Sequence, residues 1–152
     1  MPLEIERKFL PKTDAWRSAP GVYYCQGYLS RDPQRTVRVR VAGGQGYLTI
    51  KGANAGGARA EFEYAIPLDE AQQLLKLCDG PLVEKYRHVV HEHGFDWEVD
   101  AFLGENQGLV VAEIELDAID QAFVKPDWVG EEVTADARYY NSNLSLHPFS
   151  RW

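Results

Sequence analysis

The chain has 152 residues, of which 45% are hydrophobic and 26% are charged, and its net charge is −7 at pH 7. This composition is typical of one globular domain with its own core and excludes a disordered chain. The negative charge argues against a nucleic-acid surface, which is usually basic, but not against a small polyanion in a locally basic pocket. No window approaches the roughly 20 apolar residues of a membrane span, and the N-terminus has no signal-peptide pattern, so we expect a cytoplasmic protein without a membrane partner.

The first half of the chain is predicted to consist of short strands joined by turns. The first strand spans residues 3–10 and ends at Pro11, and Thr13 is expected to cap a short helix through Ser18. Further strands are expected at residues 22–29, 36–41, 46–51 and 59–66. The strands at 36–41 and 46–51 flank the sequence Ala-Gly-Gly-Gln, which is typical of a β-hairpin.

The second half begins with the clearest helix, at residues 68–78, where apolar side chains recur at helical spacing. The following Gly80-Pro81 is expected to stop this helix. Strands follow at 82–92, 95–102 and 109–116. After them we expect one helical turn at 120–123, a short extended segment at 128–133 and a helix at 134–140 that Thr134 caps.

About eight strands at hairpin-like spacing favour a mainly β fold, an eight-stranded antiparallel closed barrel with covering helices, because closure removes the sheet edges. About eight strands is also the size at which a barrel holds one small ligand. We see no internal repeat, linker or second domain, so residues 1–152 are expected to form a single domain. Cys25 and Cys78 match neither a zinc nor a redox spacing, and buried free thiols are expected.

Ionisable residues alternate with apolar residues along most of these strands. In the first strand Glu4, Glu6 and Lys8 share one face, because successive side chains of a strand point to opposite sides. The same alternation recurs at Arg38 and Arg40, at Arg59, Glu61 and Glu63, at Lys85 and Arg87, at Glu98 and Asp100, and at Glu113 and Glu115. The sequence therefore predicts one sheet with one densely charged face of mixed sign.

This charged face points either outward into water or inward around water and ligands, since a dry core would not tolerate so many ions. A solvated outward face is the ordinary explanation of a charged strand. Here, however, acidic pairs and basic pairs lie on different strands, which places like charges side by side. We favour the inward arrangement, with metal cations among the carboxylates and anionic oxygens among the basic groups.

The residue types indicate which ligands such an interior would hold. Carboxylates without cysteine suit hard divalent cations such as Mg²⁺ or Mn²⁺. Paired arginines suit the oxygens of phosphate groups. Metal and basic groups in one tunnel suit a linear polyphosphate, and phosphoryl transfer needs mainly positioning, charge neutralisation and an activated nucleophile.

The segment Glu4-Ile5-Glu6-Arg7-Lys8 resembles the ExExK signature of the CYTH superfamily, also called triphosphate tunnel metalloenzymes. Further stations of that family's pattern follow in order over nearly the whole chain. They are Thr36-Val-Arg38-Val-Arg40, Leu48-Thr-Ile-Lys51, Arg59-Ala-Glu61-Phe-Glu63, Lys85-Tyr-Arg87, Trp97-Glu98-Val-Asp100 and Ala112-Glu113-Ile-Glu115. The resemblance implies an eight-stranded antiparallel tunnel that binds triphosphate together with a divalent metal.

The resemblance also implies roles for individual residues. The positions that hold or support the metal are Glu4, Glu6, Glu61, Glu63, Asp100, Glu113 and Glu115. The positions that bind the triphosphate are Lys8, Arg38, Arg40, Lys51, Lys85 and Arg87. Among all of these, the catalytic set is expected to be Glu4, Glu6, Lys8 and Lys85. Glu98 lies on the same face, where it either joins this site or supports a basic residue.

Three activities occur in this family, and the short form of the chain resembles the inorganic triphosphatases most. We therefore expect a metal-dependent hydrolase that converts tripolyphosphate to pyrophosphate and phosphate. Thiamine triphosphatase, class IV-type adenylate cyclase and a non-catalytic polyphosphate- or nucleotide-binding module remain alternatives. Residues 134–144 resemble a C-terminal helix that lies by a tunnel mouth, where Tyr28 is one candidate contact. The sequence leaves the oligomeric state open, and a homodimer is compatible with it.

Overall fold

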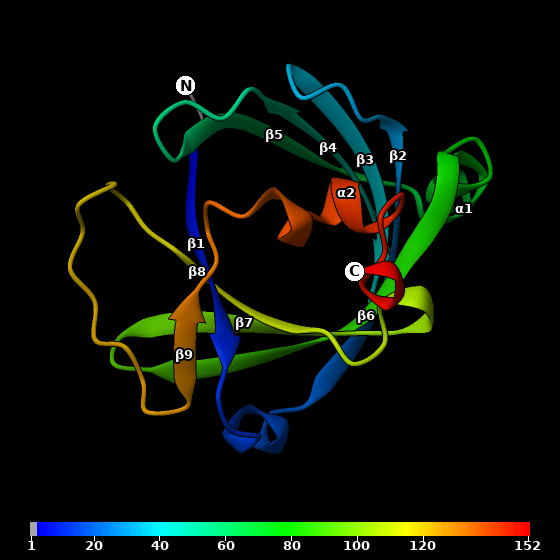
Figure 1. Cartoon of the computed structure of the whole chain (residues 1–152). Helices are drawn as coiled ribbons and strands as arrows, with labels where there is room; N and C mark the ends of the chain where they lie inside the picture. Colours follow the sequence, from blue (N-terminus) through cyan, green and yellow to red (C-terminus); the bar gives the residue numbers. More distant parts are fainter. Residues whose placement is uncertain (1–2) are drawn as a thin grey trace.

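Eight strands close into an antiparallel barrel, and a short ninth strand pairs with the C-terminal end of the first one (Figure 1). The computed structural model describes residues 3–152. The order around the barrel is β1-β5-β4-β3-β2-β6-β7-β8, and β8 returns to β1. The strands are β1 (Leu3–Pro11), β2 (Gly21–Ser30), β3 (Arg35–Ala42), β4 (Gln45–Gly52), β5 (Ala58–Ile66), β6 (Asp79–Glu92), β7 (Phe95–Phe102), β8 (Val110–Glu115) and β9 (Val129–Glu132). The predicted eight-stranded closed barrel is therefore confirmed.

The first strand closes the barrel by changing partner halfway along its length. Its residues Leu3 to Ile5 pair with β5, and its residues Glu6 to Phe9 pair with β8. The predicted hairpin between β3 and β4 is also present. Its two turn residues, Gly43 and Gly44, have positive φ angles of 56° and 82°, which a tight two-residue hairpin turn requires.

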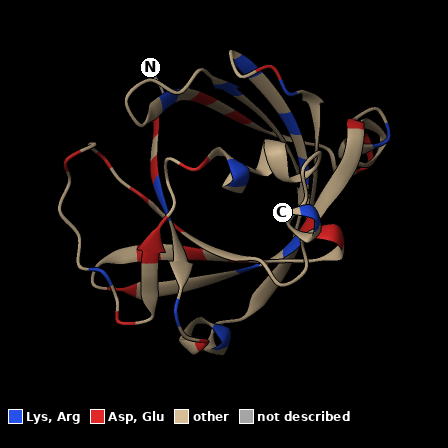
Figure 2. Ribbon diagram, in the orientation of Figure 1, with Lys and Arg blue, Asp and Glu red and all other residues tan. Residues whose placement is uncertain are grey.

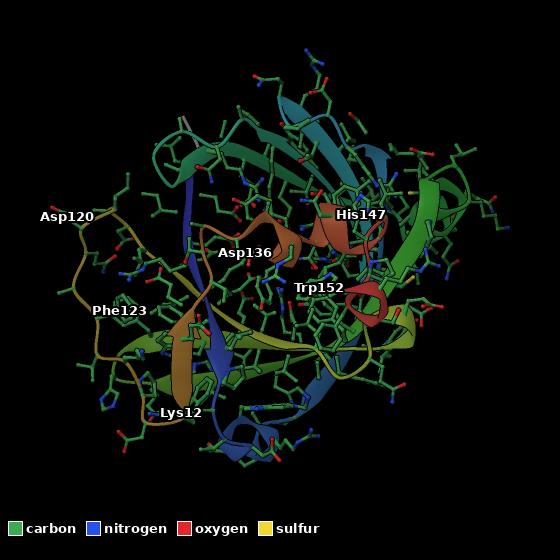
Figure 3. The ribbon with its side chains drawn as sticks, viewed as in Figure 1. Lys12, Asp120, Phe123, Asp136, His147 and Trp152 are labelled. Carbon is green, nitrogen blue, oxygen red and sulfur yellow. The ribbon has the colours of Figure 1, made fainter. Side chains whose placement is uncertain are left out.

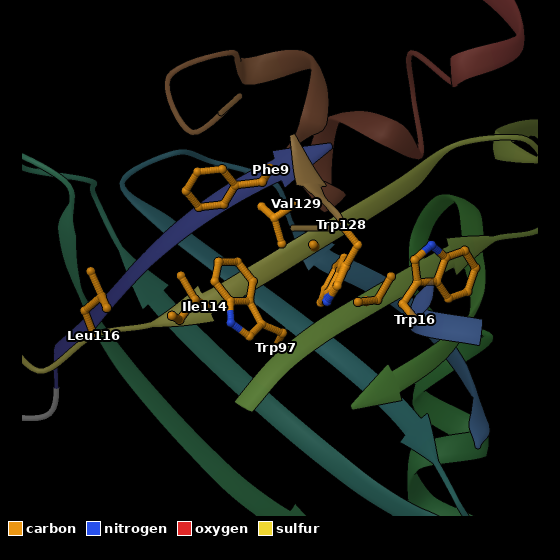
Figure 4. Close-up of a cluster of buried hydrophobic side chains, with 9 residues drawn as sticks. Phe9, Trp16, Trp97, Ile114, Leu116, Trp128 and Val129 are labelled. Carbon is orange, nitrogen blue, oxygen red and sulfur yellow. The ribbon is translucent and has the colours of Figure 1, made fainter. Parts of the chain in front are cut away.

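The main hydrophobic core lies outside the barrel, between its wall and the segments that cover it (Figure 4). Trp97 on β7 and Ile114 on β8 are almost fully buried there. The short 3-10 helix Ala15–Ser18 and the region of β9 cover them, and Trp128 packs edge-on against Trp97 at 5.9 Å between ring centroids. With its apolar side chains turned outward, the barrel wall presents its other face to the interior.

A second apolar cluster fills one end of the barrel interior. Val83, Phe102 and Val111 share the inward face of their strands with the charged residues two positions away. Leu144, from the C-terminal segment, is fully buried against this cluster. Figure 1 shows the short helix α2 (Asn141–Leu144) inside the outline of the barrel. The interior is therefore closed by side chains at this end.

The C-terminal helix differs from its prediction. In place of a helix at 134–140, the chain forms a 3-10 turn, Ala137–Tyr139, followed by α2. Thr134 does not cap a helix, because its hydroxyl accepts a hydrogen bond from the backbone N–H of Lys8 at 3.0 Å. Asp136 caps the 3-10 turn instead, by accepting from the N–H of Arg138 at 3.1 Å.

Two further elements differ from the sequence-based expectations. The helix α1 spans Leu68–Leu75, and Gly80-Pro81 belongs to β6, because Asp79 already pairs with Tyr28 of β2. Residues 120–123 do not form a helical turn. Phe123 (Figure 3) instead packs this loop against the main hydrophobic core, with its ring centroid 5.9 Å from that of Trp97. Within residues 3–152, no helix is long and apolar enough to cross a membrane.

Candidate active site

The charged face of the sheet lines a cavity of about 330 Å³ inside the barrel. Figure 2 shows basic and acidic residues on the strands around this space. The acidic lining residues are Glu4, Glu6, Glu61, Glu63, Glu98, Glu113 and Glu115, and the basic ones are Lys8, Arg38, Arg40, Lys51, Arg59 and Arg87. Two predicted site residues, Lys85 and Asp100, lie behind this lining. The structure thus turns the charged face inward, as the sorting of charges by strand indicated.

Carboxylates crowd together at one part of the cavity. Glu6 lies directly opposite Glu115 in the pairing of β1 with β8. Oxygen atoms of Glu4, Glu6 and Glu115 all lie within 4.8 Å of one another. Burial and the nearby charges of Glu98 and Glu4 raise the pKa of Glu115 to about 7. This raised pKa indicates excess negative charge at the cluster, which a cation would relieve.

Other predicted acidic residues surround this cluster. Glu61 lies 3.4 Å from the ammonium of Lys51, and Glu63 lines the cavity from an exposed position on β5. Glu113 is buried and accepts a hydrogen bond from Lys8 at 2.6 Å. Lys51 thus joins Glu61 to Glu4, and the pairing of β1 with β8 places Glu113 opposite Lys8.

Basic side chains hold the carboxylates in place. The ammonium of Lys51 donates to both oxygens of Glu4, at 2.8 and 2.9 Å. Lys8 lies between Glu113, at 2.6 Å, and Glu6, at 3.4 Å. Burial alone would lower the pKa of Lys8, but these two carboxylates outweigh burial and raise it. Lys8 is therefore held as a cation among the acidic groups, and Lys51 lies between Glu4 and Glu61.

Arg38 and Arg40 form the opposite kind of region, with buried positive charge and no carboxylate. Each is 8% exposed, and neither lies within 4.0 Å of an acidic side chain among residues 3–152. Arg38 donates to the hydroxyl of Thr49 at 3.2 Å, but its Nε is buried without a partner. Burial and the charge of Arg38 lower the pKa of Arg40 to about 9. Buried cations without counter-ions are costly, which marks this region as a site for an anion.

Behind the lining, Asp100 joins two basic residues of β6. Its carboxylate accepts hydrogen bonds from Lys85 at 2.7 Å and from Arg87 at 2.8 and 2.9 Å. Burial alone would raise the pKa of Asp100, but Arg87 and Lys85 hold it at about 2. Glu98 lines the cavity and also supports a basic residue, because it accepts a hydrogen bond from Arg87 at 3.1 Å.

Three polar residues of this region were not predicted from the sequence. The ring of Tyr24 lies under two guanidinium groups, 4.9 Å from that of Arg40 and 4.8 Å from that of Arg87. Gln26 is fully buried beside Arg40, and Asn141 reaches the cavity from the C-terminal segment. The position of Gln26 could have been predicted from the alternation of the strand, because Gln26 shares a strand face with Tyr24. The position of Asn141 could not, since Asn141 does not belong to a strand.

Comparison with known proteins identifies the family. The model of the CYTH domain matches residues 2–146. The chain belongs to the CYTH family. This confirms the family predicted from the ExExK segment and from the charged stations that follow it along the chain.

Proteins named inorganic triphosphatase are similar to this chain over nearly its full length. An inorganic triphosphatase of Acetivibrio thermocellus is 52% identical over 151 residues, which cover 98% of this chain and 97% of the relative. An inorganic triphosphatase of Nitrosomonas europaea is 37% identical over 147 residues, with 94% and 97% covered. The crystal structure of an inorganic triphosphatase has a TM-score of 0.68 at 36% identity, and the match covers 96% of each chain.

Proposed function

We propose that this CYTH protein is a metal-dependent hydrolase of inorganic triphosphate. The observation that carries the proposal is the pairing of two incomplete charge clusters in one cavity. The buried guanidinium groups of Arg38 and Arg40 have no carboxylate partner among residues 3–152. In the same cavity, carboxylate oxygens of Glu4, Glu6 and Glu115 lie within 4.8 Å of one another, and the pKa of Glu115 is raised to about 7 despite the nearby Lys8 and Lys51. A metal complex of triphosphate offers an anion to the first group and a cation to the second. The names of the two relatives agree with this substrate.

The basic residues are proposed to bind the phosphate oxygens. Guanidinium groups bind phosphate with two parallel hydrogen bonds. We therefore assign Arg38 and Arg40 to phosphate binding, at the end of the triphosphate that is farthest from the metal. Arg87, held by Asp100, adds a third guanidinium from β6, next to the same Tyr24 ring as Arg40. Lys8, Lys51 and Lys85 are proposed to neutralise the remaining phosphate charge. The cavity volume of about 330 Å³ is near the lower limit for small-molecule sites, which favours a compact ligand.

The acidic residues fit a hard divalent cation, Mg²⁺ or Mn²⁺. All potential ligands of the cluster are carboxylate oxygens, which these ions prefer, and neither cysteine lies in the cavity lining. Glu4, Glu6 and Glu115 are proposed to hold the metal, with Glu61, Glu63 and Glu113 supporting them. When bound, such a metal neutralises phosphate oxygens and lowers the pKa of a coordinated water. The protein's own part is to fix these carboxylates through Lys8, Lys51 and Arg59.

Asp100 receives a different role from the one that the family resemblance implied. Its two oxygens already accept hydrogen bonds from Lys85 and Arg87, and it lies outside the cavity lining. We assign it to positioning these two cations, which are the members of the phosphate-binding set on β6. Lys85, expected to be catalytic, is likewise set back from the lining. Burial lowers the pKa of Lys85 to about 7, and the carboxylate of Asp100, at 2.7 Å, opposes this shift and favours the charged form.

A phosphate-release screen tests the proposed function. The purified protein is incubated with triphosphate, pyrophosphate, ATP or thiamine triphosphate, each with Mg²⁺, Mn²⁺ or a chelator. We expect fast release from triphosphate with metal, little release from the other compounds, and none with chelator. Tight triphosphate binding without any phosphate release would contradict hydrolysis and favour the binding-module alternative. Faster phosphate release from thiamine triphosphate or ATP than from triphosphate would contradict the assignment of inorganic triphosphate as the substrate.

We propose that the protein is located in the cytosol. Cys25 and Cys78 are both unpaired thiols, which agrees with a reducing compartment. Both are half-buried, so they are more exposed than the buried thiols expected from the sequence.

A further inference from the structure

A relay of two hydrogen-bonded side-chain amides, Gln26 and Asn141, joins the C-terminal segment to the part of the cavity that Arg38 and Arg40 line. Arg40 donates from Nε to Oε1 of Gln26 at 2.9 Å. Nε2 of Gln26 donates to Oδ1 of Asn141 at 3.2 Å. The ammonium of Lys85 donates to the same Oδ1, also at 3.2 Å. The relay thus connects β3, β2, α2 and β6 through two neutral amides.

The two ends of the relay fix the orientation of both amides. Arginine and lysine side chains only donate hydrogen bonds, so each must face an oxygen. Gln26 therefore presents its oxygen to Arg40 and its nitrogen to Asn141. Asn141 must present its oxygen to Lys85 and Gln26, which leaves Nδ2 as the atom that does not face them. Among residues 3–152, no side chain or carbonyl accepts a hydrogen bond from this nitrogen.

The surroundings hold this arrangement rigidly. Gln26 and Lys85 are fully buried, and Gln26 lies directly opposite Arg40 in the pairing of β2 with β3. Asn141 is the first residue of α2, whose Leu144 is fully buried in the apolar end of the barrel. Asn141 lines the cavity together with its neighbours Tyr140 and Ser142. An amide donor is therefore presented to the cavity in one network with Arg40, which has no carboxylate partner among residues 3–152.

We propose that Asn141 binds the substrate through Nδ2, and that Gln26 is a positioning residue that aims Arg40 at the same phosphate group. The inference rests on the proposed function and adds to it. It makes the C-terminal segment a part of the substrate site that the strand pattern does not reveal. The ligand group recognised here is the terminal phosphate distal to the metal cluster.

The substitution Asn141→Asp tests this inference. Aspartate keeps an oxygen for Gln26 and Lys85, so a purely structural role survives the change. It removes the donor and adds a negative charge beside the phosphate. We expect the KM for triphosphate to rise about tenfold or more, with kcat within about threefold of the parent. Asn54→Asp is the matched control, since Asn54 lies outside the cavity lining and uses only its Oδ1, which aspartate keeps, to accept from the N–H of Gly57; its KM should equal that of the parent.

A second variant tests the positioning role of Gln26. Gln26→Met has a similar volume but offers no oxygen to Arg40, and it should raise the KM without a matching loss of kcat. Asn141→Ala serves in the same assay if the aspartate variant does not fold. A parental KM in both Gln26→Met and a folded Asn141 variant would overturn the inference.

Calorimetry with chelator separates this inference from the proposed function. Titration of triphosphate into the metal-free protein measures the anion site alone, whether or not hydrolysis occurs. Weaker binding to Asn141→Asp than to the parent supports the inference even if the parent releases no phosphate. Equal binding to both proteins overturns it, even if the parent is an active triphosphatase.

Discussion

Glu4→Gln and Glu6→Gln are each expected to lower kcat/KM for metal-dependent triphosphate hydrolysis by at least about 100-fold. Each substitution keeps the shape of the side chain but removes one negative charge from the cluster that Glu115 completes. The remaining carboxylates should hold the metal less tightly, so part of the activity should return at high Mg²⁺ or Mn²⁺. The measurement is phosphate release over a range of metal concentrations.

Glu132→Gln is the matched control for these variants. Glu132 pairs with Arg7, on the outer face of β1, by hydrogen bonds of 2.6 and 2.8 Å. It is thus a paired glutamate next to the same strand but outside the cavity. The substitution Glu132→Gln should leave the dependence of phosphate release on metal concentration unchanged. Parental metal dependence in Glu4→Gln and Glu6→Gln would mean that the metal binds elsewhere.

Arg38→Ala is expected to raise the KM for triphosphate about 10- to 100-fold while it leaves the thermal stability of the ligand-free protein unchanged or higher. The reason is that Arg38 is a buried cation with no carboxylate partner among the described residues, so its charge opposes folding in the absence of an anion. The same charge attracts the substrate. Steady-state kinetics and thermal unfolding without ligand measure the two effects.

Arg7→Ala should give the opposite result. Arg7 binds Glu132 outside the barrel, and its guanidinium lies 4.9 Å from the ring centroid of Phe123. Its removal should lower the unfolding temperature and leave the KM unchanged. If Arg38→Ala instead destabilised the protein like Arg7→Ala and kept the parental KM, Arg38 would be a structural residue and not part of the phosphate site.

The strand pattern predicted the barrel and the direction of its charged face because alternation determines which side chains share a face. The eight-stranded closed barrel was predicted and is present. The pairing partners could not be predicted in the same way, since they depend on which strands are neighbours. For example, the contact of Lys8 with Glu113 follows from the register of β1 with β8.

The closed end of the barrel shows where sequence reasoning was incomplete. On β6, the inward face changes from charged to apolar between Lys85 and Val83. The alternation of side chains along this strand already places Val83 on the same face as Lys85, so this closed end could have been predicted from the sequence. The position of the C-terminal segment was harder to predict. Its helical turns are short, and Asn141 acquires its partners, Gln26 and Lys85, only through the tertiary fold.

A crystal structure with Mn²⁺ and a non-hydrolysable imido analogue of triphosphate tests the central claim most directly. We expect an anomalous manganese peak among Glu4, Glu6 and Glu115, with the phosphate chain running from it to the guanidinium groups of Arg38 and Arg40. Manganese outside the barrel, or phosphates that do not contact these two arginines, would contradict it.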